Sequence, residues 1–218
     1  MSTRTTRSAF GRRVGRILSR TVISRLLRTA QDARRAQFKA LGPQRAHIVM
    51  LGDSITEFGI WEEWFADSPM SNRGIGGEIS GQVLTRLNSA IDRPRAVFLL
   101  IGTNDLAFGI PRDEIVHNVA TIVTTIEQLA PGTPVVLQSV MPRALAFRDE
   151  ILALNQLYRE LVEAAPAHVR YLDLWPALAT PEGALRPEFT EDKLHLNGNG
   201  YAAWVKQLQP IVTEPARA

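Results

Sequence analysis

The chain has 218 residues, of which 45% are hydrophobic and none is cysteine. This composition fits one domain with a full core plus an appendage, and it excludes disulfides, thiolate metal sites and, for want of a long apolar run, a membrane-spanning helix. The net charge of +3 divides unevenly: residues 1–45 carry +11, whereas the rest, with 13 basic and 21 acidic side chains, carry −8. We therefore separate a basic N-terminal helical extension, 1–45, from an acidic globular domain, 46–213, and expect no nucleic-acid partner.

The basic N-terminal segment shows helical periodicity. Its apolar residues recur at spacings of three and four, which places them on one face of a helix, and most arginines fall on the opposite side. Gly42-Pro43 is expected to end this helix before the first strand. The apolar face consists of Leu18, Val22, Leu26, Ala30 and Ala33, and the arginines opposite are Arg16, Arg20, Arg28, Arg34 and Arg35.

Three interpretations of this helix are open. It docks on the acidic body of the same chain, it binds the surface of an anionic membrane, or it is a targeting peptide. The pair Arg12-Arg13 resembles the start of a twin-arginine signal, but further arginines interrupt the stretch that should be apolar, and no cleavage site of small residues follows. We therefore expect a cytoplasmic protein without a cleavable signal peptide, and contact with a membrane surface through this helix is the alternative.

After residue 45, strand and helix patterns alternate. The strands are short, continuous apolar runs typical of a parallel sheet that is buried on both sides, so the expected fold class is α/β with helices on both faces. The predicted strands are 46–51, 70–73, 96–101, 134–140 and 169–172. The predicted helical segments are 80–90, 111 or 112 to 129, 148–164 and 198–208, and 55–65 is predicted as a short helix or an ordered loop. A further loop is expected at about 176–193.

The functional prediction depends first on Gly52-Asp53-Ser54. This stretch follows the first apolar strand and precedes a helical pattern, so the Ser54 hydroxyl is expected at the sheet edge where open α/β folds bind ligands. The N–H of Ser54 would lie at a helix N-terminus, next to the place where an oxyanion forms. The simpler alternative is a turn with a helix cap, because Asp and Ser are both common caps.

Three further polar clusters occupy loops. Two follow predicted strands, and because the carboxyl ends of parallel strands share one edge, we expect Ser54, the Gly77 backbone and Asn104 to meet there. The third contains a carboxylate three residues before a histidine. The clusters are Gly76-Gly77-Glu78, Gly102-Thr103-Asn104-Asp105 and Asp192-Lys193-Leu194-His195.

These residue types are the ones that acyl transfer requires. Ser54 is the candidate nucleophile, His195 the base, since imidazole titrates near neutral pH, and Asp192 the group that fixes the imidazole tautomer. The N–H groups of Ser54 and Gly77 and the side-chain amide of Asn104 are candidate oxyanion donors. An Asp-x-x-His pair is also half of a metal site, but no second His or Cys cluster joins it, so we expect neither a metal nor a cofactor.

The four clusters, in this order, resemble the SGNH hydrolases, also called the GDSL esterase/lipase family. The resemblance covers roughly residues 46–210, and the second block is similar to that of the platelet-activating-factor acetylhydrolase-like and lysophospholipase-like branch. Two positions depart from the pattern: Ile55 replaces the usual Leu, and Glu78 replaces the usual Asp. The matching blocks are Gly52-Asp53-Ser54-Ile55, Asn72-Arg73-Gly74-Ile75-Gly76-Gly77, Gly102-Thr103-Asn104-Asp105 and Asp192-Lys193-Leu194-His195.

The resemblance implies a flavodoxin-like three-layer α/β/α sandwich and metal-free ester hydrolysis in an open site. It also implies that the oxyanion N–H comes from the second block, where Gly77 is the best match and Gly76 the other candidate. Ser54, Asp192 and His195 would form the triad, with Asn104 as the remaining oxyanion donor. No Gly-x-Ser-x-Gly elbow of α/β-hydrolases occurs in the sequence.

The expected activity is hydrolysis of short acyl or O-acetyl esters of a small molecule through an acyl-serine intermediate. The alternatives are a lysophospholipase at a membrane, an acyltransferase to a sugar or alcohol, and a non-catalytic carbohydrate- or lipid-binding module; homo-oligomer formation is left open. Trp61, Trp64 and Phe108 are candidates to line the substrate pocket, and packing in the core is the alternative for each of them.

Overall fold

The computed structural model describes residues 28–213, which form one sheet of five parallel strands. The strand order is β2-β1-β3-β4-β5, the order of flavodoxin-like doubly wound sheets. The predicted α/β class is therefore confirmed. The strands are β1 (Ile48–Gly52), β2 (Met70–Gly74), β3 (Ala96–Leu100), β4 (Val135–Gln138) and β5 (Val169–Leu172).

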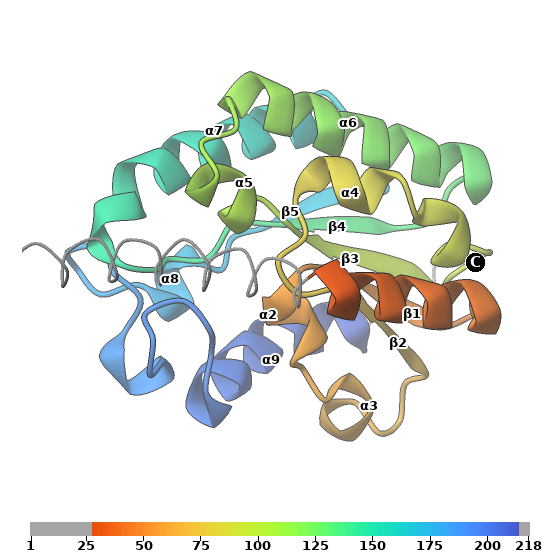
Figure 1. The fold of residues 1–218 in the computed structure, drawn as a ribbon, viewed down its shortest axis with the longest axis horizontal. Coiled ribbons are helices and arrows are strands. Elements are labelled where there is room, and N and C mark those ends of the chain that lie inside the picture. Colours follow the sequence, from red (N-terminus) through yellow and green to blue (C-terminus); the bar gives the residue numbers. More distant parts are fainter. Residues whose placement is uncertain (1–27, 214–218) are drawn as a thin grey trace, which may run out of the picture.

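Helices cover both faces of this sheet, which gives three layers (Figure 1). The helices α4, α6 and α7 lie on one face, and α2, α3, α8 and α9 on the other. Within residues 28–213, no helix has the length and apolar character needed to cross a bilayer. The helices are α2 (Ser54–Glu57), α3 (Trp61–Trp64), α4 (Ser80–Leu84), α5 (Thr103–Ala107), α6 (Arg112–Leu129), α7 (Arg148–Glu163), α8 (Trp175–Leu178) and α9 (Gly198–Val212), with 3-10 turns at Leu87–Ser89, Leu145–Phe147 and Pro187–Phe189.

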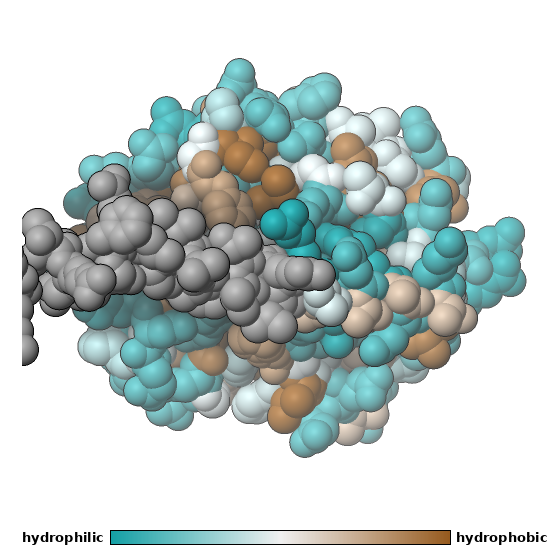
Figure 2. Space-filling view, viewed as in Figure 1, coloured by the Kyte–Doolittle hydropathy of each residue, from teal (hydrophilic) through white to brown (hydrophobic). Residues whose placement is uncertain are grey.

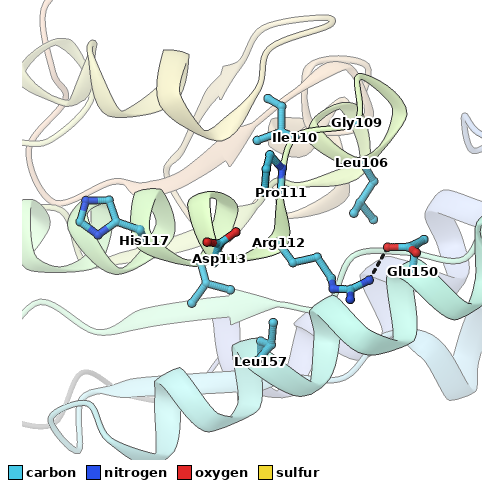
Figure 3. Close-up of a pocket in the computed structure, with 10 residues that line it drawn as sticks. Leu106, Gly109, Ile110, Pro111, Arg112, Asp113, His117, Glu150 and Leu157 are labelled. Atoms are coloured by element: carbon cyan, nitrogen blue, oxygen red, sulfur yellow. Dashed lines mark hydrogen bonds and ion pairs between the residues drawn. The ribbon is translucent and has the colours of Figure 1, made fainter.

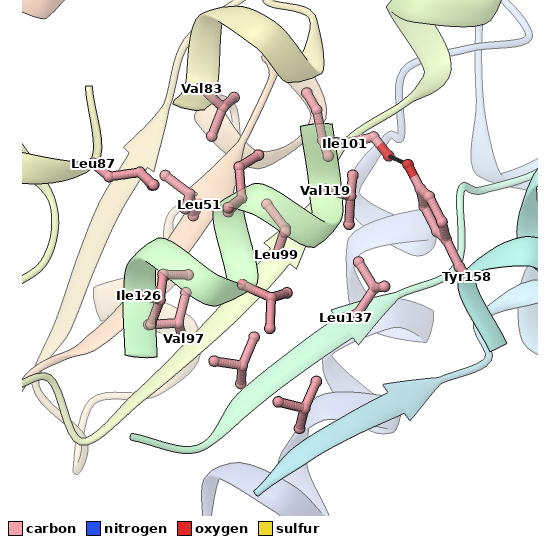
Figure 4. Packing of buried hydrophobic residues seen from close by; sticks show 14 of the residues in the cluster. Leu51, Val83, Leu87, Val97, Leu99, Ile101, Val119, Ile126, Leu137 and Tyr158 are labelled. Carbon is pink, nitrogen blue, oxygen red and sulfur yellow. Dashed lines mark hydrogen bonds between the residues drawn. The ribbon is translucent and has the colours of Figure 1, made fainter. Parts of the chain in front are cut away.

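One hydrophobic core lies between the sheet and α4, α6 and α7 (Figure 4). Because side chains alternate along a strand, Val97 and Leu99 of β3 face this core, whereas Phe98 and Leu100 face the other one. The hydroxyl of buried Tyr158 on α7 donates a hydrogen bond to the carbonyl of Ile101 at 3.2 Å. This contact ties α7 to the end of β3, from which the segment carrying Asn104 emerges.

A second core lies on the opposite face and is built around aromatic rings. Trp61 and Trp204 meet edge to face with ring centroids 4.7 Å apart. The indole N–H of Trp61 donates to the carbonyl of Thr56 at 2.9 Å, and the Tyr201 hydroxyl donates to the carbonyl of Ile55 at 2.6 Å. These bonds anchor α2, so the core-packing alternative is the correct one for Trp61.

The N-terminal helix, described over 28–41, presents a different face to the body from the one that its periodicity predicts. Ala30 and Ala33, which we expected on the buried face, are exposed. The residues turned to the body are Gln31, Arg34, Arg35 and Phe38. Gly42, with φ of +68°, follows the end of the helix, as predicted.

The physical reason for this difference is the polar surface that the helix meets. Arg34 and Arg35 form ion pairs of 2.9 Å with Glu57 and Glu78, and Phe38 is buried with the Arg73 guanidinium over its ring. Residues 28–41 therefore dock on the body of the chain. The rest of the predicted apolar face, Leu18, Val22 and Leu26, lies outside the described residues, and contact with a membrane surface stays a prediction.

Some element boundaries differ from the predicted ones. The last helix continues past Leu208 to Val212, although Pro210 lies inside it. Proline removes one helical hydrogen bond, but Leu208 and Val212 are both buried against the second core, and this packing extends the helix. The predicted loop 176–193 contains most of α8 and a 3-10 turn.

Candidate active site

Ser54 is the first residue of α2, immediately after β1. Asp53 caps this helix, because its Oδ1 accepts the N–H of Ile55 at 3.0 Å. Gly52 leaves no space for a side chain, since a Cβ there would lie 2.3 Å from the carbonyl oxygen of Leu100. The strand and the helix therefore fix Ser54 at the carboxyl edge of the sheet, where the sequence predicts it.

The structure aligns the three side chains predicted as a catalytic triad. The Oγ of Ser54 lies 3.0 Å from Nε2 of His195, although 141 residues separate them in the chain. The Nδ1 of His195 lies 2.6 Å from Oδ2 of Asp192. This is the arrangement in which a histidine can remove the serine proton while the carboxylate holds its tautomer.

The loop around Asp192 is stabilised by the same carboxylate. Its Oδ1 accepts the backbone N–H of Leu194 at 2.9 Å and that of His195 at 2.7 Å. Partial burial raises the pKa of Asp192, but the hydrogen bonds from the His195 side chain and from the backbone outweigh burial and lower it to about 2. Asp192 is therefore ionised at neutral pH, as a partner of the imidazolium must be.

The candidate oxyanion donors are not equivalent. The N–H of Gly76 is already bonded to Oε2 of Glu57 at 2.6 Å, whereas the N–H of Gly77 makes no hydrogen bond to any described residue. The φ of Gly77 is +73°, a conformation that glycine adopts without strain. Of the two candidates from the sequence, Gly77 thus has the free donor.

Asn104 lies on α5 at the end of β3, next to the same glycine turn. Its Nδ2 donates to the carbonyl of Glu78 at 2.9 Å and lies 3.5 Å from Oδ2 of Asp53. The topology thus brings the first three polar clusters to one edge, as predicted, and Asn104 contacts the residue that follows Gly77.

Sequence reasoning missed three side chains at this edge. Glu57 and Phe58 are three and four residues beyond Ser54, a spacing that places them on the same side of a helical turn and that could have indicated them. The Phe58 ring lies 5.3 Å from the His195 ring, centroid to centroid. Arg143, which follows β4, donates from Nη1 to the carbonyl and hydroxyl of Thr103 at 3.2 Å; only its place after a strand could have suggested it.

The other histidines do not contact Ser54, in line with the prediction that they are not part of the site. The Nδ1 of His47 lies 3.1 Å from the carbonyl of Met70, and the Nε2 of His168 lies 2.8 Å from Glu127. His117 is on the exposed side of α6. Among residues 28–213, no three His, Asp or Glu side chains gather in a group that could hold a metal ion.

Several large apolar side chains of the described residues are exposed at the surface. On the face shown in Figure 2, brown hydrophobic patches are separated by hydrophilic surface. Phe58 beside His195 is 56% exposed, and Phe108, on the turn after α5, is 70% exposed. Trp64 is partly exposed, so Trp64 and Phe108 remain candidates for substrate contact.

A groove of about 1000 Å³ runs between α6 and α7 (Figure 3). Its apolar wall includes Leu106 of α5, and Arg112 and Glu150 form an ion pair across it. None of Ser54, Asp192 and His195 lines this groove. The groove is therefore separate from the triad, in which Asp192 is exposed, His195 is half-buried and Ser54 is buried.

Burial of Asp53, beside the nucleophile, predicts a pH dependence of stability. Burial, reinforced by the carboxylates of Asp105 and Glu78, raises the pKa of Asp53 to about 7 against the Ile55 hydrogen bond. The folded state therefore holds a proton that the unfolded chain releases near pH 4, so this group's contribution to stability falls as pH rises from about 4 to about 7. We expect Asp53→Asn to become more stable relative to the wild type by on the order of 2 kcal/mol between pH 5 and 8.

Urea unfolding of both proteins at several pH values measures this difference. Asparagine keeps the oxygen that accepts the Ile55 N–H, so the helix cap remains. Asp113→Asn, an exposed carboxyl on α6, is the control and should follow the wild type at every pH. Parallel stability curves for wild type and Asp53→Asn would show that Asp53 ionises in the folded protein like an ordinary carboxyl.

Fold and site together define a doubly wound α/β protein with serine, histidine and aspartate side chains aligned at the carboxyl edge of its sheet. The chain belongs to the GDSL-like lipase/acylhydrolase family, whose model matches residues 50–203. It is 31% identical over 175 residues to the platelet-activating factor acetylhydrolase IB subunit alpha1 of Pongo abelii, which covers 76% of this chain and 74% of that protein. The family suggested by the four polar clusters is thus confirmed.

Solved structures agree on the fold. A protein from Streptococcus pneumonia that is named for platelet activating factor superposes with a TM-score of 0.84 at 27% identity, covering 90% of this chain and 99% of that one. A carbohydrate esterase family 3 protein from Talaromyces cellulolyticus gives a TM-score of 0.65 at 19% identity, covering 77% and 96%. At that identity the second likeness concerns the fold alone.

Proposed function

We propose that the protein is a serine esterase that hydrolyses short acyl esters through an acyl-Ser54 intermediate. The observation that carries the proposal is the 3.0 Å contact between Ser54 Oγ and His195 Nε2, continued by the 2.6 Å contact from His195 to Asp192. Membership of an acylhydrolase family supports the hydrolase class.

The reaction follows from these contacts. His195 removes the proton of Ser54 as the serine oxygen attacks the ester carbonyl, and Asp192 stabilises the imidazolium that forms. The oxyanion is stabilised by N–H groups of Ser54 and Gly77 and by the amide of Asn104. His195 then protonates the leaving alcohol, and water, deprotonated in turn by His195, releases the acid from Ser54.

A short acyl group is favoured by the shape of the site and by a relative. Among the described residues, Asp192 and Phe58, which lies beside His195, are exposed, and the groove of Figure 3 does not reach Ser54. A long acyl chain would therefore find little enclosed apolar surface near the nucleophile. The relative from Pongo abelii is named an acetylhydrolase, which agrees with a small acyl group.

The proposal is tested with p-nitrophenyl esters from acetate to palmitate. We expect kcat/KM to reach its highest value with acetate to butyrate and not to rise with longer chains, because each added methylene gains little buried surface. The control is enzyme inactivated by a fluorophosphonate, which labels only an activated serine. A maximum at palmitate would contradict the short-acyl assignment and favour a lysophospholipase.

Two further outcomes would contradict hydrolysis itself. Acyl transfer to added glycerol or glucose without release of free acid would indicate an acyltransferase. A folded protein that neither turns over any ester nor reacts with the fluorophosphonate would indicate a binding module. Both outcomes are read in the same assay by quantifying free acid, acylated acceptor and labelled protein.

A further inference from the structure

The described N-terminal helix, residues 28–41, lies against the loop that contains the candidate oxyanion glycine. We call residues 74–78 the oxyanion loop. Three side chains of the helix, Gln31, Arg34 and Arg35, contact this loop. Their spacing of three and four residues places them on one helical face, so the helix holds the loop along its length. This helix lies outside residues 50–203, which the family model matches.

The central contact comes from Gln31, which is 8% exposed. Its Nε2 donates to the carbonyl oxygen of Gly76 at 2.8 Å. This carbonyl and the N–H of Gly77 belong to one peptide group, and in a planar trans peptide the two bonds point in opposite directions. A carbonyl drawn toward the helix therefore directs the Gly77 N–H away from the helix.

The same peptide lies next to the nucleophile. A Cβ placed on Gly76 would lie 3.7 Å from the Cβ of Ser54, and one placed on Gly77 would lie 3.2 Å from Nε2 of Gln31. The peptide between the two glycines is thus located between the helix and Ser54. Glycine peptides rotate easily, so such an N–H needs an external contact to keep its direction.

Arg34 contacts the oxyanion loop at Gly74, two residues before Gly76. Its Nε lies 2.7 Å from the carbonyl of Gly74 and 2.9 Å from Oε1 of Glu57. The second oxygen of Glu57 accepts the Gly76 N–H at 2.6 Å. Both polar groups of Gly76 are therefore bonded, whereas the N–H of Gly77 has no acceptor among residues 28–213.

Arg35 fixes the end of the loop. It pairs at 2.9 Å with Glu78, which is buried completely and is also paired with Arg86 at 2.7 Å. The carbonyl of Glu78 accepts the Asn104 amide at 2.9 Å. The helix, the oxyanion loop and Asn104 thus form one network of hydrogen bonds and ion pairs. Breaking a buried hydrogen bond in such a network is costly.

We propose that Gln31 is a positioning residue of the oxyanion hole: its hydrogen bond to the Gly76 carbonyl orients the Gly77 N–H toward the developing oxyanion. This inference rests on the proposed esterase function. Gln31 touches neither substrate nor reacting atoms, so it acts through Gly77. Because the oxyanion is absent from the bound substrate and develops only on the way to the tetrahedral intermediate, loss of Gln31 should lower kcat and leave KM nearly unchanged.

The test uses Gln31→Met in the full chain, since methionine keeps the length and volume of glutamine but has no donor. We expect kcat for p-nitrophenyl acetate to fall about tenfold, less than the 10²–10³-fold that removal of an oxyanion donor costs. Gln37→Met is the matched control, since Gln37 is exposed on the same helix, and it should retain full activity. Gln31→Lys, which keeps a donor, should restore most of kcat.

Thermal unfolding of each variant separates positioning from general damage. The inference is overturned if Gln31→Met keeps kcat within twofold, or if the methionine and lysine variants lose kcat equally. If Gln31→Met does not fold, Arg34→Met, compared with exposed Lys39→Met, breaks the hold on Gly74 and should lower kcat selectively; an unchanged kcat there overturns the inference too. Ester hydrolysis that persists in folded Ser54→Ala would instead refute the proposed acyl-Ser54 mechanism, so the two failures are distinguishable.

Discussion

Replacement of Ser54 by alanine is expected to reduce kcat for p-nitrophenyl acetate by roughly 10⁴–10⁶-fold. The change removes the oxygen that lies 3.0 Å from His195 Nε2, so no acyl-enzyme can form. The residual rate would come from water that the remaining donors orient. The measurement is the initial rate at saturating ester, together with fluorophosphonate labelling, which should disappear.

The structure indicates that this variant folds. Ser54 is small, and its hydroxyl contacts only His195 among the described hydrogen-bond partners, so the free energy of unfolding should change by no more than about 0.5 kcal/mol. Ser68→Ala, in the turn before β2, is a suitable control and should keep the wild-type rate. Hydrolysis by folded Ser54→Ala within tenfold of the wild type would show that another group is the nucleophile.

The sequence predicted the residues of the candidate site, but it did not predict the contacts that hold these residues in place. Ser54, Asn104 and the Gly77 turn follow apolar strands, and the rule that parallel strands end at one edge is enough to bring them together. The pairing of His195 with Ser54 was inferred from residue types and from a resemblance, because no local pattern specifies a contact across 141 residues.

The helix 28–41 shows why the contacts that hold the site in place could not be predicted. Periodicity identifies an apolar stripe, but Ala30 and Ala33 bury little surface, and ion pairs with two acidic groups on the body decided the orientation instead. Which arginine meets which carboxylate depends on the folded body. The role that we infer for Gln31 likewise depends on a single carbonyl, Gly76, whose direction no sequence pattern reveals.

Replacement of Asp192 by asparagine is expected to lower kcat by roughly 10²–10⁴-fold. In the wild type one carboxylate oxygen accepts the Nδ1–H of His195 and the other accepts the N–H groups of Leu194 and His195. Asparagine has one acceptor for these two tasks. If its oxygen keeps the backbone bonds, its NH₂ group faces Nδ1, the imidazole proton moves to Nε2, and His195 can no longer remove the proton of Ser54.

The opposite orientation of the amide restores the tautomer but leaves two backbone N–H groups without their acceptor, which destabilises the loop. Either way the rate falls, and thermal unfolding shows which orientation prevails. Glu191→Gln is the control, because it removes the neighbouring carboxylate charge while the contact with Asn197 can remain. Because the pKa of Asp192 is held at about 2, its stabilising contribution is complete above about pH 4 and is lost toward pH 2. If Asp192→Asn keeps kcat within threefold of the wild type at pH 7, the prediction is wrong. Ser54 and His195 would then act without the Asp192 carboxylate, and the loop alone would orient the imidazole.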